Sequence, residues 1–409
     1  MFLDSLFYDA CSDTTKSLNS ISNYINKKYK VKISKQGIDN RFNEEAIRYV
    51  QSLIAESLSN QVKPTIEAGW SNLFKRILLK DSTKFDVSEN LAKQLPGFGG
   101  SASKAGVCIQ YEFDLKSGDV NDLSITAANR PDSKDATETI DKVQKGDLIL
   151  RDLGYSKLKC FFDIDKKGAY FISKLSPSIA VYENKKGQFV ELDFVKLHKL
   201  MTRGKIQRLD KWVFLGEKDK LPVRLVIELM PAAEVIKRLI KVEKENKKKG
   251  QKTSEKYKTR AHFNLFITNV GDNNFEPEKI SKIYKLRWQV ELVFKVWKSI
   301  FGIDNNHEMK YERLICLLNA RLLLILINWD IFMQKRADLF ERKGRLISIN
   351  KCFKTFHENL HELRQILMSN CKKIINWVKE MFRLFDSNHW LEKKKNKMGL
   401  AEILLLKCS

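Results

Sequence analysis

The chain has few cysteines, and they follow no recognisable pattern. Its seven cysteines are scattered over 409 residues, and no C-x-x-C pair occurs. This scatter argues against a disulfide framework and a cysteine-based zinc site, and it predicts reduced thiols in a cytosolic protein. The N-terminal residues MFLDSLFYDACSD lack a basic segment followed by a long apolar one, so we expect no signal peptide. No internal repeat of clear period is visible.

Acidic residues are in deficit. The sequence holds 50 Asp and Glu against 74 Lys and Arg, a formal net charge of +24. An excess of this size usually accompanies a polyanionic partner, most often nucleic acid. The many Asn and Ile residues leave a second explanation open, namely a lysine-rich surface encoded by an AT-rich genome.

Long hydrophobic runs are also missing. The most apolar stretch, LICLLNARLLLILINW at 314–329, is interrupted by Asn319 and Arg321 and is shorter than a comfortable bilayer span. We therefore predict a buried helix there and no membrane association. Hydrophobic residues make up 43% of the chain, which is enough for real cores, either in two or three domains or in one large domain with insertions.

The spacing of apolar residues predicts helices first and strands afterwards. Residues 1–73 have helical periodicity, and ISKQGIDNRFNEEAIRYVQSL at 33–53 predicts two short helices with a turn at Gly37, a weak helix-turn-helix signal. Three strands, a helix, a strand and a helix follow, which predicts a mixed sheet with the first and fourth strands side by side, as in the RNase H-like fold. These elements are expected at 73–87, 106–128 (a hairpin), 133–146, 147–152 and 156–168.

Residues 170–270 return to strand patterns, interrupted by a basic run. KVEKENKKKGQKTSEKYKTR at 241–260 holds nine Lys and Arg against three Glu. We predict a mobile, solvated loop there, with a phosphate contact as the second possibility. From residue 277 onward the pattern is helical, and KKKNK at 393–397 either touches phosphate or only aids solubility.

Two aspartates follow the predicted neighbouring strands. Asp81 lies at or near the end of the first strand, in DST, and Asp152 ends the fourth, in RDLGY. Either side chain could simply cap a turn. If the two strands lie side by side, however, the carboxylates face each other and repel unless a cation lies between them.

The segment YKLRWQVELVFKVWK at 284–298 offers a third carboxylate. On one continuous helix, at about 100° per residue, Tyr284, Arg287, Glu291 and Lys298 share an arc of about 60° beside a buried apolar face. The simpler interpretation is an amphipathic helix with a charge pair between Arg287 and Glu291.

Three carboxylates from these segments form a donor set suited to a hard cation. Asp81, Asp152 and Glu291 would bind Mg²⁺ or Mn²⁺ through oxygen. Paired metals about 4 Å apart activate water on one side of a phosphodiester and stabilise the leaving oxygen on the other. Trp288 and Trp297 are expected to be packing residues that hold the glutamate in place.

These motifs resemble the DDE transposases of the bacterial insertion-sequence-four (IS-four) family. The resemblance implies an α+β fold of mixed type. In it, an RNase H-like catalytic core carries a β-rich insertion between the second Asp and the Glu, and helical N- and C-terminal regions flank the core. The matching motifs, within residues 30–335, are DST at 81–83, RDLGY at 151–155, FITNV at 266–270 and the Y-R-E-K signature Y-x2-R-x3-E-x6-K at 284–298. The implied regions are 1–73 (helical, DNA-binding), 74–175 (core, first part), 176–272 (insertion), 273–335 (core, helix carrying Glu) and 336–409 (helical, dimerisation or DNA contact).

The resemblance also implies cut-and-paste transposition, with Asp81, Asp152 and Glu291 as the catalytic triad that holds two Mg²⁺ or Mn²⁺ ions. A metal-bound water nicks the transposon end, the freed 3′-OH attacks the opposite strand to form a hairpin, and the hairpin is reopened before the 3′-OH attacks target DNA. The implied partners are double-stranded DNA, as terminal inverted repeats and as target, and a second copy of the chain in a synaptic homodimer. The implied location is the bacterial cytoplasm, at the nucleoid.

Four further residues are implied in DNA binding. Tyr284, Arg287 and Lys298 would hold phosphates near the active site, and the forked guanidinium of Arg287 suits a phosphate. Trp212 would stack on a base turned out of the hairpin. The alternative for Trp212 is a core position in the strand KWVFLG.

Three other functions stay open on the sequence. HENLH at 357–361 matches the H-E-x-x-H motif of zinc proteases, although its His residues merely flank an apolar helical stripe and no further zinc ligand has a convincing context. A transposase-derived regulator would bind DNA without cutting it, but the presence of all three carboxylates argues against that function. An RNase H-like nuclease would hydrolyse DNA without joining strands.

Overall fold

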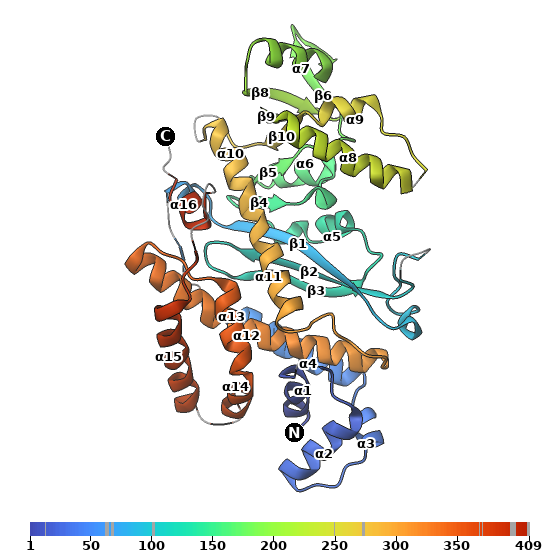
Figure 1. The fold of residues 1–409 in the computed structure, drawn as a ribbon, viewed down its shortest axis with the longest axis vertical. Helices are drawn as coiled ribbons and strands as arrows, with labels where there is room; N and C mark the ends of the chain where they lie inside the picture. Colours follow the sequence, from blue (N-terminus) through green and yellow to red (C-terminus); the bar gives the residue numbers. More distant parts are fainter. Residues whose placement is uncertain are drawn as a thin grey trace. The chain divides into compact units, whose positions relative to one another are not determined.

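The computed structural model describes residues 1–12, 14–61, 65–66, 69–99, 103–248, 250–271, 275–367, 369, 371–392 and 398–406 (Figure 1). The predicted boundary between residues 272 and 273 and the basic run at 393–397 lie outside the described residues. The chain divides into two compact units whose segments alternate along the sequence. The first unit consists of Met1–Ala68, Lys80–Arg130 and Trp288–Leu405, and the second of Gly69–Leu79, Pro131–Arg287 and Leu406–Ser409.

The first unit is mostly helical. Its strands have the order β3-β2-β1, and the first three residues of β1 belong to the second unit. Its strands are β1 (Ile77–Asp86), β2 (Gly106–Asp114) and β3 (Val120–Ala127). Its helices are α1 (Phe2–Ala10), α2 (Leu18–Tyr29), α3 (Lys35–Asp39), α4 (Glu44–Ser59), α11 (Trp288–Ser299), α12 (Tyr311–Lys343), α13 (Ile349–Glu358), α14 (Leu360–Leu367), α15 (Cys371–Asn388) and α16 (Leu400–Leu404).

The hairpin predicted at 106–128 is confirmed, because β2 and β3 pair antiparallel. Its turn needs Gly118, whose φ of +83° favours glycine. A Cβ on Gly118 would lie 2.5 Å from Cγ of Met333 in α12, so the close approach also requires glycine. Trp329 of the same helix donates from Nε1 to the Gly118 carbonyl at 2.7 Å. Helix α12 therefore fixes the turn of the hairpin.

Helix α12 contains the apolar stretch of the sequence, and the prediction of a buried helix is confirmed. By length and composition alone α12 could cross a membrane, but 89% of its most apolar 18-residue stretch is buried inside the protein. Within the first unit it contacts α1, α4, α13 and α15. It is the central helix of this unit.

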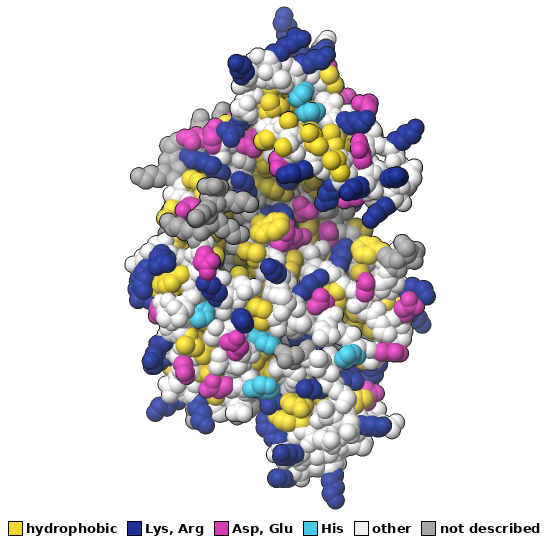
Figure 2. Space-filling view, viewed as in Figure 1, with side chains coloured by type: hydrophobic (Ala, Val, Ile, Leu, Met, Phe, Trp, Pro, Cys, Tyr) yellow, Lys and Arg dark blue, Asp and Glu magenta, His cyan; other side chains and the backbone are white. Residues whose placement is uncertain are grey.

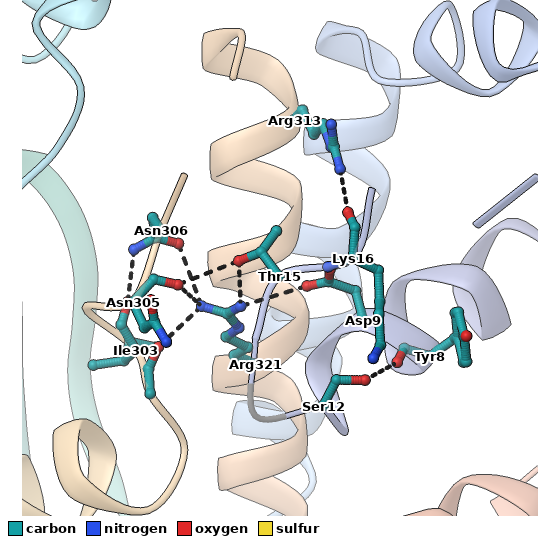
Figure 3. Close-up of polar contacts among 11 residues, drawn as sticks. Tyr8, Asp9, Ser12, Thr15, Lys16, Ile303, Asn305, Asn306, Arg313 and Arg321 are labelled. Carbon is teal, nitrogen blue, oxygen red and sulfur yellow. Dashed lines mark hydrogen bonds and ion pairs between the residues drawn. The ribbon is translucent and has the colours of Figure 1, made fainter. Parts of the chain in front are cut away.

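Arg321 explains the polar interruption of α12 (Figure 3). Its guanidinium is buried, donates to the Asn305 carbonyl and the Thr15 hydroxyl, and lies 3.5 Å from the buried Asp9 carboxylate. Asp9 also accepts from the Lys16 amide at 2.6 Å. Because both charges are paired and hydrogen-bonded, the interior tolerates them. The cluster fastens α1 and the segment after α11 to α12.

The second unit contains a mixed sheet. Its strand order is β1-β4-β5-β10-β9-β8-β6-β7. Strands β4 and β5 are parallel, and each neighbouring pair from β5 through β10, β9, β8 and β6 to β7 is antiparallel. Its strands beyond β1 are β4 (Leu148–Arg151), β5 (Tyr170–Lys174), β6 (Val181–Lys185), β7 (Gln188–Glu191), β8 (Arg208–Leu215), β9 (Leu221–Leu229) and β10 (Phe263–Thr268). Its helices are α5 (Asp132–Glu138), α6 (Leu158–Lys166), α7 (Phe194–Arg203), α8 (Ala232–Lys248), α9 (Glu255–Arg260) and α10 (Pro277–Tyr284).

The order of elements follows the prediction from the sequence. Strands β1, β2 and β3 precede α5, β4 and α6, and β1 neighbours β4 in the strand order. Helix α6 connects the parallel strands β4 and β5, and its Phe161 and Ile164 join Phe171 of β5 in one buried apolar cluster. The protein therefore has the mixed α+β architecture that the sequence predicts. The boundaries of the five regions stay a prediction.

The basic run at 241–260 is not the loop that the sequence predicts. Helix α8 continues to Lys248, and α9 follows after Ser254, whose side chain accepts from the Tyr257 amide and caps that helix. Lys and Glu are good helix formers, so charge density alone does not prevent a helix here.

Two shorter predictions are also wrong. Gly37 lies inside α3 and not in a turn, because Ser34 accepts from the Gly37 amide and caps the helix one residue before it begins. The helix predicted at 133–146 ends at Glu138, where the chain continues as a separate 3-10 turn. Polar caps and turns decide both boundaries.

The half-buried carboxyl of Asp330 in α12 makes the stability of the fold depend on pH. Burial, and secondly the nearby Asp119 carboxylate, raises the pKa of Asp330 to about 7. The folded chain therefore holds this proton at pH values where the unfolded chain has released it. The stability that results is fully present below pH ~4, the usual pKa of Asp, and is lost as the pH rises through 7.

We predict that Asp330→Asn gains stability relative to the parent as the pH rises from about 4 to 8, because Asn carries no charge to bury. Urea unfolding at several pH values measures the difference, and Asp141→Asn, at an exposed position, is the control. Parallel stability curves for the parent and Asp330→Asn across this pH range would contradict the assignment.

Candidate active site

Asp81 lies in the middle of β1, so the prediction that it lies at or near the end of the strand is wrong. The strand continues to Asp86 because Thr83 and Phe85 extend the inward-facing alternation of side chains. Asp81 is half-buried, and its Oδ1 accepts from the Ser82 amide at 2.8 Å. Since no turn follows Asp81, capping of a turn does not explain its presence.

A buried ion pair fixes the strand at this point. Lys80 is fully buried, and its Nζ lies 2.7 Å from Oδ2 of Asp122 in β3, which is 5% exposed. The pair links β1 to β3 across β2. Side chains alternate along a strand, so Asp81 projects from the face opposite Lys80.

The Y-R-E-K signature does not lie on one continuous helix. Helix α10 ends at Tyr284, a 3-10 turn covers Lys285–Arg287, and α11 begins at Trp288. The prediction of a single four-turn helix is therefore wrong, and the boundary between the two units falls directly after the 3-10 turn. Glu291 and Lys298 stay near one face of α11, because seven residues are about two helical turns.

The first unit brings the helix of Glu291 against the strand of Asp81. Glu291 is half-buried and lies in the first turn of α11, where the helix dipole favours a carboxylate. Lys298 at the other end of α11 donates from Nζ to the Lys84 carbonyl of β1 at 2.9 Å. The same ammonium lies 5.9 Å from the ring centroid of Phe85.

The second unit contains Asp152, which directly follows β4 as predicted. Its carboxylate makes no capping hydrogen bond to the 3-10 turn Leu153–Tyr155, although its backbone carbonyl accepts from the Tyr155 amide. Capping of that turn therefore does not occupy the half-buried Asp152 side chain. Its oxygens are available for another role.

The second unit also brings Tyr284 and Arg287 to the end of β4. Tyr284 is buried, and its hydroxyl donates to the Arg151 carbonyl at 3.4 Å, one residue before Asp152. The guanidinium of Arg287 lies 6.0 Å from the Tyr284 ring centroid. The hydrogen bond from Tyr284 to Arg151 lies where α10 ends and the tighter 3-10 turn begins.

Trp212 and Trp288 are both exposed, although Trp288 is expected from the sequence to pack. Trp212 in β8 is 48% exposed, so the alternative of a core tryptophan is wrong. Trp288 is 55% exposed and lies one turn before Glu291, whereas Trp297 is buried against Tyr111 as expected. The pattern of residue types could not reveal the exposure of Trp288, because an aromatic residue at helical spacing usually packs inside.

The zinc-protease motif lacks its required setting. HENLH is divided between two helices, since α13 ends at Glu358 and α14 begins at Leu360. His357 packs edge-on against the Phe301 ring. Among the residues that the structure describes, no group of three or more His, Cys, Asp or Glu side chains could hold a metal ion. Each unit contains only part of the predicted Asp, Asp, Glu set.

Positive charge is distributed widely. Figure 2 shows Lys and Arg side chains scattered over the visible face of the protein, with no single dominating patch. Net charge therefore supports a polyanionic partner without locating where it binds.

Comparisons with known proteins agree with the motifs. Residues 72–327 match the family described as transposase DDE domain. The transposase for insertion sequence element IS231F of Bacillus thuringiensis subsp. israelensis is 31% identical over 381 residues, which span 88% of this chain and 80% of that protein. The transposase for insertion sequence element IS1151 of Clostridium perfringens is 28% identical over 367 residues, which span 85% of this chain and 76% of that protein.

A solved structure is similar more remotely. The piggyBac transposase synaptic complex with hairpin DNA matches 98% of this chain and 77% of that chain, with 10% sequence identity and a TM-score of 0.42. A TM-score this low does not establish a shared fold.

We predict that Lys80→Met lowers the free energy of unfolding by about 3–5 kcal/mol, because the buried Asp122 then loses its ion pair with Lys80. The double variant Lys80→Met/Asp122→Leu should recover most of the loss, since both members of the ion pair are then apolar. Guanidinium unfolding measures both. A single variant as stable as the parent would show that the pair does not hold β1.

Proposed function

The chain belongs to the transposase DDE domain family, and we propose that Asp81, Asp152 and Glu291 are the carboxylates with which it cuts and joins DNA. Enzymes of this family are metal-dependent DNA nucleases and strand transferases, and the chain is a DNA transposase of the insertion-sequence type. One observation carries the assignment of residues. The family match at 72–327 includes all three carboxylates, each half-buried on or beside a regular element.

The chemistry of the donor set fits a divalent cation. Three carboxylates supply hard oxygen ligands of the kind that Mg²⁺ and Mn²⁺ prefer, and Asp152 makes no capping bond that would compete. We propose that Asp81, Asp152 and Glu291 hold two such ions. When bound, the ions provide Lewis-acid stabilisation of charge on a phosphodiester and a lowered pKa for water.

Three side chains of the Y-R-E-K signature are proposed to serve DNA binding. Arg287 offers a planar fork that matches two phosphate oxygens. Lys298 gives one donor to the Lys84 carbonyl, and an ammonium has three, so it can hold β1 and a phosphate together. Tyr284 is buried, so its contribution would be to position the end of β4 beside Asp152.

The proposed reaction is cut-and-paste transposition through a hairpin intermediate. Its setting is an RNase H-like core with a β-rich insertion at 176–272, and Trp212 in that insertion stacks on the base turned out of the hairpin. The exposure of Trp212 on β8 supports this role, because a stacking residue needs an accessible face.

The proposed partners follow from the same reaction. Two copies of the chain each bind one terminal inverted repeat and together engage target DNA, in the bacterial cytoplasm at the nucleoid. The alternatives are a regulator that binds DNA without cutting it, and a nuclease that hydrolyses DNA without joining strands.

We predict that Asp81→Asn, Asp152→Asn and Glu291→Gln each lower DNA cleavage by about 10³-fold or more, since loss of a metal ligand costs several kcal/mol of transition-state stabilisation. DNA binding should persist. A strand-transfer assay with Mg²⁺, on DNA flanking the coding region, measures this. Asp86→Asn, at the exposed end of β1, is the matched control and should cut normally. Cleavage by Asp81→Asn at the parent's rate would refute the assignment.

We predict that Trp212→Ala lowers hairpin formation about tenfold, whereas first-strand nicking continues, because base stacking contributes about 1–3 kcal/mol. Trp212→Phe should restore much of the hairpin. Both products are separated on a denaturing gel. Release of ends without any hairpin by the parent would favour the nuclease, and unchanged hairpin yield in Trp212→Ala would exclude this stacking role.

A further inference from the structure

The second unit contains a basic cavity of about 650 Å³ beneath α8 and α9. Its walls come from α8, α9, β5 and β10, which Figure 1 shows close together. The cavity includes residues of the basic run at 241–260. Five cations and two carboxylates line it, namely Lys174, Lys237, Arg238, Lys241, Arg260, Glu234 and Glu245. Positive charge is therefore in excess along the walls of this open cavity.

Arg238 is held in place by hydrogen bonds to neutral groups. Its Nη1 donates to the carbonyls of Ala261 at 3.2 Å and Phe263 at 2.9 Å, and its Nη2 donates to Oδ1 of Asn264 at 2.9 Å. All three acceptors are neutral. A guanidinium that is oriented by neutral groups keeps its attraction for an anion.

Arg260 is a buried cation in the same wall. Its side chain is 6% exposed, and Nη1 donates to the Pro177 carbonyl at 2.7 Å. Among the described residues, its buried Nε has no hydrogen-bond partner. Burial lowers the pKa of Arg260, so the interior disfavours its charge. An anion in the cavity would offset that cost.

Lys174 connects the cavity to Asp152. Strands β4 and β5 are parallel, with Ile149 opposite Phe171, and the same register extended by three residues sets Asp152 opposite Lys174. Burial and then Arg238 lower the pKa of Lys174, and Asp152 acts in the opposite direction. Leu153, the residue after Asp152, also lines the cavity.

We propose that this cavity binds a phosphodiester group of a DNA strand that continues past Asp152. A free phosphate offers similar oxygen acceptors, but the cavity is large enough for a whole nucleotide unit and its wall includes Tyr257, Phe263 and Leu265, which suit a sugar. The ligand is identified as DNA on the basis of the proposed function. The cavity then extends the grip on DNA beyond the Y-R-E-K residues.

The test compares two double variants of the full chain with equal loss of charge. Lys174→Gln/Lys241→Gln removes two cations from the cavity, whereas Lys199→Gln/Lys218→Gln removes two exposed cations of the same unit outside it. Binding to a short random-sequence DNA duplex is measured over a range of salt concentrations. Thermal melting checks that both variants fold. A third variant, Lys174→Arg/Lys241→Arg, keeps both positive charges and is the charge-conserving control.

The cavity variant should bind DNA about tenfold more weakly, and its dependence of log K on log salt should be less steep by about 1–2, roughly one for each lost phosphate contact. The exposed-lysine control and the Arg variant should match the parent. Equal slopes for both Gln variants would overturn the proposal, and a parent that still cuts DNA in this case would leave the proposed function intact. Stabilisation of the parent but not the cavity variant by inorganic phosphate, with equal DNA slopes, would assign the cavity to free phosphate and also overturn it.

Discussion

The ion pair between Lys80 and Asp122 constrains β1, and the candidate active site depends on that strand. Separating these two buried charges costs free energy, so the pair helps to hold β1 in register with β2 and β3. Asp81 comes next in the strand and must project from the opposite face. Lys298 then bonds the backbone of β1 from α11, so the helix that carries Glu291 is fastened to the same strand.

The second unit positions its part of the site by backbone geometry. The parallel pairing of β4 and β5 brings their C-terminal ends to one edge of the sheet, where Asp152 follows β4 and Lys174 ends β5. Tyr284 donates to the carbonyl of Arg151 and packs on Phe266 of β10. The position of Asp152 is therefore fixed by the strand before it. The cations near it come from elements that are far apart in the sequence.

Local signals account for part of what the sequence predicts, and some of its misses depend on contacts between distant residues. Alternating apolar residues and a Gly turn are local signals, so the hairpin and the strand before Asp152 are predicted correctly. The break at 285–287 accompanies a contact between Tyr284 and Arg151, which no local pattern contains. The helix in the basic run is likewise anchored by bonds from Arg238 to a segment more than twenty residues away.

The central claim is that Asp81, Asp152 and Glu291 hold the same metal ions. Replacing Mg²⁺ by Fe²⁺, which also binds carboxylates, and adding peroxide with ascorbate generates radicals that cleave the protein backbone beside the bound iron. Mapping the cuts tests the claim directly. We expect cuts near all three residues, suppressed by excess Mn²⁺ and lost in Asp81→Asn. Cuts near only one of them, or an unchanged pattern in Asp81→Asn, would contradict it.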